Sequence, residues 1–281
     1  MTVIDQRAAH IEAARNEGTR YKVTERRVLR AEWFKFWTLR SSWITLAVAA
    51  VVMLGFGWIA SASYSPGQTQ SVGGPPGSST VTDVVGLALS GTNLALLAIG
   101  VLGVLFGASE YSTGLIKATL AAVPKRWPVL AAKAAVIGTV SLVAATAGAF
   151  LAFLVGATAV DDSIALTLGD SGVVRSLLGA GVYLALVGVL SVGLGMLLRS
   201  VASSVAVLIG TFLLLPNLIG LLPDSLNDAI SSYLPSNAGS SMMSLTTGSG
   251  SLSPSAGFAV MVGWVVLVLG AAAYQLRRRD A

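Results

Sequence analysis

The stretch AAVIGTVSLVAATAGAFLAFLVGATAV, residues 134–160, decides the fold class because none of its residues is charged. A helix of about 20 apolar residues is long enough to cross the hydrocarbon core of a bilayer. The stretch lacks the alternation of apolar and polar residues that a membrane β-strand shows. We therefore predict a transmembrane helix here.

Five more apolar runs of similar length flank this one, at 43–62, 84–108, 173–198, 201–222 and 256–276. The composition agrees: 54% of the 281 residues are hydrophobic and only 11% are charged, with a mean hydropathy of +0.77. A soluble domain carries about 25% charged residues. These features exclude a soluble enzyme, a secreted disulfide scaffold and a disordered chain, and predict an all-α membrane protein with six transmembrane helices.

The basic residues predict the orientation of the spans. Of the 18 lysines and arginines, only Arg175 falls on the side opposite to the others in a six-span chain. The positive-inside rule then places both termini in the cytoplasm of a plasma-membrane protein. The outer loops are 63–83, 161–172 and 223–255. The net charge of +5 is thus a topology signal, and we expect no nucleic-acid binding. The predicted units are a polar cytoplasmic tail (1–23), an interfacial connecting helix (24–42) and the six-helix domain (43–281).

Counting excludes several kinds of site. The chain has no cysteine, and His10 in the N-terminal tail is its one histidine. Disulfides, thiolate metal sites and an intramembrane serine–histidine protease are therefore excluded. No G-x-x-x-x-G-K-[ST] phosphate-binding loop occurs in the chain, so the chain is predicted to bind no ATP and to need no cofactor.

The segment TERRVLRAEWFKFWTLR, residues 24–40, predicts an amphipathic helix lying in the inner headgroup layer. Its apolar arc on a helical wheel consists of Leu29, Trp33, Phe36 and Trp37. Arg26 and Arg40 also fall on this arc, which makes the amphipathicity imperfect. The alternative is a generic basic anchor before the first span.

The segment 107–133, GASEYSTGLIKATLAAVPKRWPVLAAK, predicts a short helix over 110–123 that Pro124 ends. Glu110 would then lie at its N-terminus, where the helix dipole favours an anion. A short amphipathic helix between two spans is suited to docking into a groove of a soluble partner. The alternative is an ordinary inner loop with a cluster of basic residues.

A second short helix is predicted over 224–234, on the outer side before the last span. Leu226, Ile230 and Leu234 would share one face, and Pro235 would end the helix. We predict a pathway or gate role, or alternatively plain packing, for three residues inside the spans, Asn93, Pro216 and Asn217. Ile230 of the outer helix is a further candidate for the pathway or gate. Pro216 should kink the fifth span. Gly103 and Gly107 form a G-x-x-x-G pattern, to which little weight is given because the chain contains 31 glycines.

The loop motifs, taken in order, resemble a known family. The run Glu110-Tyr111-Ser112-Thr113-Gly114, then Thr119-Leu120, then Pro124-Lys125-Arg126, resembles the cytoplasmic loop of ABC-2 type transporter permeases. The stretch LRAEWFKFWTLRSSW (29–43) resembles the N-terminal connecting helix of the same family, particularly of actinobacterial members. YLPSNAGSSM (233–242) and the terminal RRRDA are similar to the family as well, so the resemblance covers the chain from about residue 24 to its end.

The resemblance implies a permease subunit that pairs with a second permease chain and with separate ATP-binding subunits. Helix 110–123 would be the coupling helix, docking through Glu110, Tyr111, Gly114, Lys117, Pro124, Lys125 and Arg126. ATP would be hydrolysed on the partner, so the chain itself would not be an enzyme. Apolar spans without a central charge suit export of hydrophobic, amphipathic or lipid-like cargo. The alternatives are a stand-alone carrier or channel, and a permease-like scaffold without transport.

Overall fold

The computed structural model describes residues 24–64, 84–122, 126–159, 166–223, 226–227, 230–245 and 251–278. Within these ranges the regular structure is entirely helical, and none of the described residues forms a β-strand. The prediction of an all-α chain is confirmed for this part of the protein. The predicted tail 1–23 lies outside the described residues.

Among the described residues, six helical segments are long and apolar enough to cross a membrane, which agrees with the number predicted from the sequence. The first is α3 (Arg40–Ala62), and the second combines α4 (Val84–Ala88) with α5 (Thr92–Thr113). The third and fourth are α7 (Trp127–Ala157) and α8 (Val173–Leu198). The fifth runs from α9 (Val201–Ile209) through η1 (Gly210–Leu214) to α10 (Leu215–Ile219), and the sixth is α13 (Pro254–Arg278).

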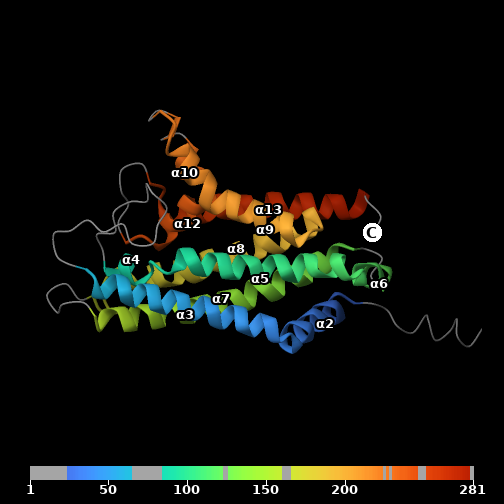
Figure 1. The fold of residues 1–281 in the computed structure, drawn as a ribbon, viewed down its shortest axis with the longest axis horizontal. Helices are drawn as coiled ribbons and strands as arrows, with labels where there is room; N and C mark the ends of the chain where they lie inside the picture. Colours follow the sequence, from blue (N-terminus) through green and yellow to red (C-terminus); the bar gives the residue numbers. More distant parts are fainter. Residues whose placement is uncertain are drawn as a thin grey trace, which may run out of the picture.

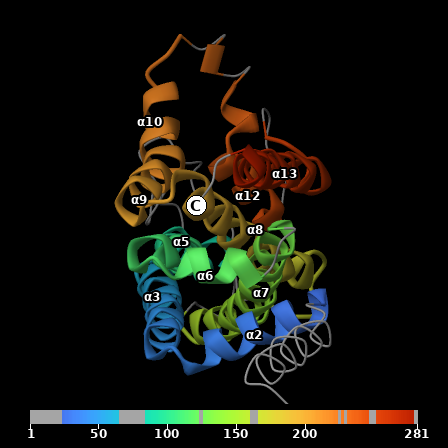
Figure 2. The same cartoon turned by 90° about the vertical axis from the view of Figure 1, so that its right-hand side faces the viewer.

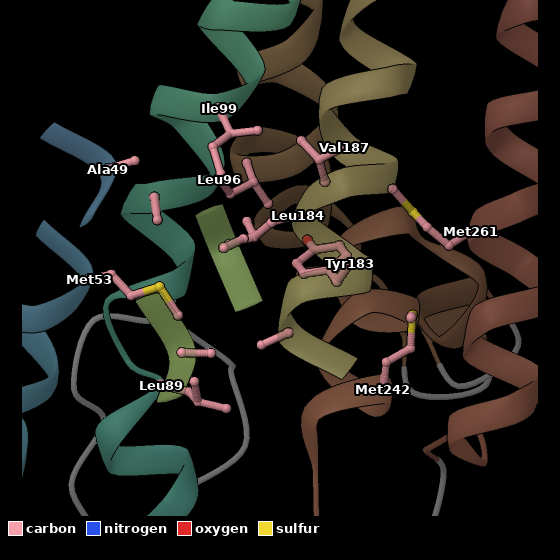
Figure 3. Packing of buried hydrophobic residues seen from close by; sticks show 14 of the residues in the cluster. Ala49, Met53, Leu89, Leu96, Ile99, Tyr183, Leu184, Val187, Met242 and Met261 are labelled. Atoms are coloured by element: carbon pink, nitrogen blue, oxygen red, sulfur yellow. The ribbon is translucent and has the colours of Figure 1, made fainter. Parts of the chain in front are cut away.

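The α8 helix is the centre of the bundle, and it packs against α5, α7 and α13. Nearly three-quarters of its apolar window is buried, whereas α3, α9–α10 and α13 are less than one-third buried. Figure 3 shows the core around Tyr183 and Leu184 of α8, with Leu96 and Ile99 of α5 beside them. The poorly buried helices expose apolar side chains outward, as helices in contact with lipid do.

Gly103 and Gly107 form the contact between α5 and α8, although their pattern carried little weight as a sequence signal. A Cβ atom at Gly107 would lie 2.6 Å from the carbonyl oxygen of Val192, and one at Gly103 would lie 2.8 Å from the Cβ atom of Ser191. Two helix backbones approach this closely only where side chains are missing. The pattern is therefore a packing motif in this fold.

The two ends of the bundle carry different elements. α2 (Glu25–Thr38), α6 (Leu115–Ala122) and the last turn of α13 lie at one end, here named the α6 end, and α4 and α12 (Pro235–Met243) lie at the other (Figure 1). α2 is separated from α3 by Leu39, whose backbone is extended. Figure 2 shows α2 and α6 together at this end, on either side of α7.

The outer helical segment stops just before Pro235, as predicted, but Pro235 also begins a further helix that was not predicted. Leu226, Asn227 and Ile230 are helical, and a 3-10 turn follows over Ser231–Tyr233 (η2). Pro235 then begins α12, where the missing N–H of proline has no helical partner to lose. Ile230 is 43% exposed and Leu234 is buried, so of these two residues only Leu234 packs inside the bundle.

The fifth span is irregular just before Pro216. A π-helical stretch, Gly210–Leu214, precedes α10, and α10 then leaves the bundle (Figures 1 and 2). Proline has no N–H to donate to the preceding turn, and such irregularity is a usual response to that loss. The Asn217 side chain donates to the carbonyl oxygen of Leu213 at 2.5 Å, so its observed role is local bonding within the helix.

Candidate functional site

The predicted helix 110–123 is two helices in the structure. α5 continues to Thr113 and ends at Gly114, which adopts a left-handed conformation with φ +75°. α6 then covers Leu115–Ala122. Glycine at this position ends helices readily because it carries no Cβ atom. Glu110 therefore lies in the last turn of α5, and the prediction that it begins a helix and interacts with an N-terminal dipole is wrong.

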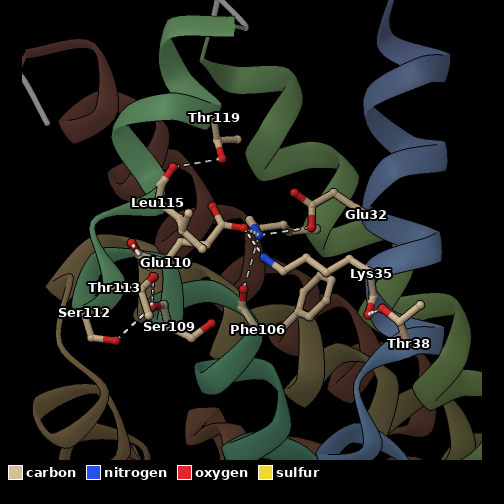
Figure 4. Close-up of polar contacts among 11 residues, drawn as sticks. Glu32, Lys35, Thr38, Phe106, Ser109, Glu110, Ser112, Thr113, Leu115 and Thr119 are labelled. Carbon is tan, nitrogen blue, oxygen red and sulfur yellow. Dashed lines mark hydrogen bonds and ion pairs between the residues drawn. The ribbon is translucent and has the colours of Figure 1, made fainter.

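Glu110 is buried rather than presented to a partner, with 4% of its surface exposed. Its Oε1 atom accepts from Lys133 Nζ at 2.7 Å and also from Lys35 Nζ. Lys133 is fully buried, and its Nζ atom lies 3.1 Å from Glu32 Oε2. We name these four residues, Glu32, Lys35, Glu110 and Lys133, the charge cluster. Figure 4 shows Glu32, Lys35 and Glu110 pointing toward one another.

The three helices that meet in the charge cluster are far apart in the sequence. Glu32 and Lys35 come from α2, Glu110 from α5 and Lys133 from α7. Lys133 lies inside α7 because this helix begins at Trp127, seven residues before the predicted start of the third span. Pro128 in the first turn favours that start. The cluster thus joins the second and third spans to the connecting helix α2.

The cluster is electrically balanced, with two ammonium groups and two carboxylates. The Phe106 ring adds a second contact for the cations, lying 4.8 Å from Lys133 Nζ and 5.8 Å from Lys35 Nζ. Lys133 Nζ also donates to the Phe106 carbonyl oxygen at 3.4 Å. Burying a charge without a partner is costly, and removal of one partner from a buried pair costs about 3–5 kcal/mol. The cluster therefore resists separation of α2, α5 and α7.

Tyr111 connects the end of α5 to the turn between the fourth and fifth spans. The guanidinium carbon of Arg199 lies 5.5 Å from the centroid of the Tyr111 ring. Arg199 has φ +55° and follows the last residue of α8. The C-terminal turn of α5 is therefore held from two sides, through Glu110 and through Tyr111.

α6 itself is only partly attached to the bundle. Ile116 is buried, whereas Leu115 is 59% exposed and Ala118 is also exposed. A Cβ atom at Gly114 would meet no atom within 4 Å, so the turn before α6 is open to the outside. The helix thus presents a small apolar face at the α6 end.

The basic residues predicted to border α6 are only partly described. Lys117 lies on α6, and Pro124 and Lys125 lie outside the described residues. Arg126 donates to the carbonyl oxygen of Leu276 at 3.1 Å. This bond satisfies a carbonyl in the last turn of α13, a common use of arginine at a helix C-terminus, so Arg126 holds the sixth span to the start of α7.

The predicted pathway residues lie on three different parts of the chain, and only the sequence neighbours Pro216 and Asn217 share a helix. Asn93 lies in the first turn of α5, where it is exposed, and not midway along a continuous helix. Pro216 and Asn217 lie on α10, and Ile230 lies on the chain that follows it. The apolar pocket lined by Met53, Ile99, Leu184 and neighbouring residues of α3, α5, α7 and α8 holds only about 10 Å³, which is no more than the space of one water molecule.

The sequence analysis missed both Glu32 and Lys133, because Lys133 was counted among the basic residues of an inner loop and Glu32 was assigned no role. A signal was present: Glu32 lies between Val28 and Phe36 at helical spacing, and these three are the buried residues of α2. A charged residue in an apolar stripe requires an opposite charge on the neighbouring helix. The pattern does not indicate which helix packs against α2 and supplies that charge.

Among the residues that the structure describes, no three histidine, cysteine or acidic side chains are grouped as metal ligands. A comparison of the chain with protein-family models finds no match. A comparison with curated proteins finds none either. The geometry of the α6 end therefore carries the functional argument.

Proposed function

We propose that this chain is the membrane-spanning permease subunit of an ATP-driven transporter of the ABC-2 type, which exports hydrophobic, amphipathic or lipid-like cargo. The observation that carries the proposal is α6, a short and partly exposed helix between the second and third spans. The helix before it, α5, and the helix after it, α7, both contribute residues to the charge cluster. ATP is hydrolysed on a separate ATP-binding subunit that docks on α6.

The connections of α6 suit the transmission of a force. Gly114 lies four residues after Glu110, so a displacement of α6 acts directly on the end of α5. Glu110 is paired with Lys133 of α7 and Lys35 of α2. A movement that an ATP-binding subunit imposes on α6 would therefore shift the second span, the third span and α2 together, because their relative positions are held by buried charges.

The distribution of charge supports a cytoplasmic location for α6 and for both termini. The basic helix α2, with Arg26, Arg27, Arg30 and Lys35, and the last turn of α13, with Arg277 and Arg278, lie at the α6 end together with α6. The positive-inside rule assigns such an end to the cytoplasm. An ATP-binding subunit of a plasma-membrane exporter works on that side, and α2 would lie along the inner surface of the membrane as the interfacial connecting helix.

Two permease chains are proposed to form the transport pathway between them. The 10 Å³ pocket inside one bundle cannot hold a cargo molecule. The poorly buried helices α3, α9–α10 and α13 leave apolar surface for lipid and for a second copy or a similar chain. A pathway lined by leucine, valine and alanine favours apolar cargo.

The test places bulk on the exposed surface of α6. Ala118→Trp and Gly114→Trp should leave membrane levels unchanged but abolish co-purification with an ATP-binding subunit encoded beside this gene, and with it ATP-dependent transport. Gly114→Asn is the matched control, because asparagine tolerates φ +75° better than other side chains; this variant should still assemble.

Normal assembly and transport by both tryptophan variants would contradict the proposal. The segment would then be an ordinary inner loop, and a stand-alone carrier or a scaffold would become the better hypothesis. The Gly114→Asn control separates obstruction of docking from distortion of the turn between α5 and α6, because it retains the backbone conformation and adds only a small side chain.

A further inference from the structure

We propose that the outward face of α2 binds the headgroups of anionic phospholipids. α2 has two distinct faces. Val28, Glu32 and Phe36 are buried against the bundle, and Glu32 is held there by Lys133. The opposite face is directed away from the protein, and its composition matches one occupant, a negatively charged membrane surface.

The outward face combines aromatic rings with arginines in one narrow sector. At about 100° per residue, Arg26, Arg30, Trp33 and Trp37 fall within roughly 60° of the helix circumference. All four are exposed, and Trp33 and Trp37 lie 6.1 Å apart between ring centroids. Arg26, which makes the helix look imperfectly amphipathic in the sequence, therefore shares the sector of the tryptophans.

This sector carries no carboxylate. α2 contains two glutamates: Glu32 is buried in the charge cluster, and Glu25 lies about 80° from Trp33 around the helix axis. Arg30 also lies over the Phe34 ring, with its guanidinium carbon 5.6 Å from the centroid. Positive charge on the face is thus not neutralised by acids of α2, and the complementary ligand is an anion.

The position of the face relative to α3 identifies the anion as a lipid. Trp37 packs on Trp43 with ring centroids 4.7 Å apart, and Trp43 lies in the first turn of the spanning helix α3. Tryptophan prefers the headgroup layer of a bilayer. Arginine beside it can reach a lipid phosphate and bind it through two parallel hydrogen bonds. Arg40, the exposed first residue of α3, extends the same basic surface.

The inference takes from the proposed function only that α2 lies at the membrane surface; it needs no ATP-binding subunit.

The test uses the purified full-length chain in phosphatidylcholine vesicles that contain a minor fraction of phosphatidylglycerol. One of the two lipids is brominated in each preparation, and quenching of tryptophan fluorescence reports contact. Trp58, Trp127 and Trp264 are replaced with phenylalanine, so that the tryptophans on α2 and at the start of α3 are the reporters.

In the chain with its arginines unchanged, brominated phosphatidylglycerol should quench the tryptophan fluorescence more strongly than the share of this lipid in the vesicle predicts. Arg26→Gln/Arg30→Gln should lower this preference by about 25-fold, roughly fivefold for each arginine. Higher salt should weaken it as well. Arg277→Gln/Arg278→Gln is the matched control: it removes two exposed arginines from the last turn of α13 at the same end of the bundle, and should leave the preference unchanged.

Quenching by each lipid in proportion to its share of the vesicle would overturn the inference, because the face would then contact lipid without selection for charge. Absence of quenching by either lipid would also overturn it, because the face would then contact no lipid. Co-purification of the ATP-binding subunit is measured on the same variants. If the subunit binds while lipid selectivity is absent, the inference alone fails; if lipid selectivity is present without any subunit, the proposed function alone fails.

Discussion

Replacing Lys133 with methionine should destabilise the protein more than the same change at Lys35, although both lysines pair with the same oxygen of Glu110. Methionine keeps much of the length of lysine and removes its charge. Lys133 has no exposed side-chain surface, whereas 31% of the Lys35 side chain is exposed. The comparison therefore isolates burial as the variable.

The magnitude follows from what each change leaves behind. Without Lys133, Glu32 loses its ion-pair partner while it remains 5% exposed, and removing one partner from a buried pair costs about 3–5 kcal/mol. Without Lys35, Glu110 still has Lys133 at 2.7 Å. Loss of a partly exposed pair costs about 0–1 kcal/mol.

Thermal unfolding of the detergent-solubilised chain, followed by tryptophan fluorescence, measures the difference. Lys133→Met should lower Tm by on the order of 10 °C, and Lys35→Met by less than about 4 °C. Lys133→Met/Glu32→Gln should recover a large part of the loss, because a neutral glutamine in place of Glu32 no longer needs a cation and the pair between Glu110 and Lys35 remains. Equal Tm losses for the two lysine variants, or a double variant no more stable than Lys133→Met alone, would refute the argument that the buried cluster holds α2, α5 and α7 together.

Two further predictions concern topology and packing. Cysteines introduced at Ser71 and Ser249 should react with a membrane-impermeant thiol reagent in intact cells, because both positions lie in predicted outer loops. The native chain has no cysteine, so the label reports these two positions alone. Labelling only after the cells are permeabilised would contradict the proposed orientation. Gly107→Leu should lower the folded yield, measured by size-exclusion chromatography, at a cost of about 1–3 kcal/mol for overpacking against Val192. Gly263→Leu is its control because a Cβ atom there meets nothing within 4 Å, and similar yields for the two variants would mean that α5 and α8 are not in close contact at Gly107.

The sequence alone determined that the chain is helical, that it has six spans, and where the basic residues gather. These properties depend on composition summed over about 20 neighbouring residues, because a bilayer imposes the same length and polarity on every span. The break at Gly114 could also have been placed, since glycine is the residue that most readily ends a helix in a left-handed conformation. The residues Tyr111, Leu115, Ala118 and Ala122 form a stripe at helical spacing that continues across the glycine, and this stripe favoured a single helix over 110–123 instead.

The tertiary structure decided which charged residues are buried and which are presented. Glu110 and Glu32 reach Lys133 across sequence separations of 23 and 101 residues, and no local pattern specifies such a meeting. The same holds for Gly103 and Gly107, whose pattern occurs often by chance and acquires meaning only when α8 lies against it. A charge near the end of a span is a solvated flank or a buried ion-pair partner depending on the helix beside it, because the free energy of a charge is set by its surroundings and not by its position in the chain.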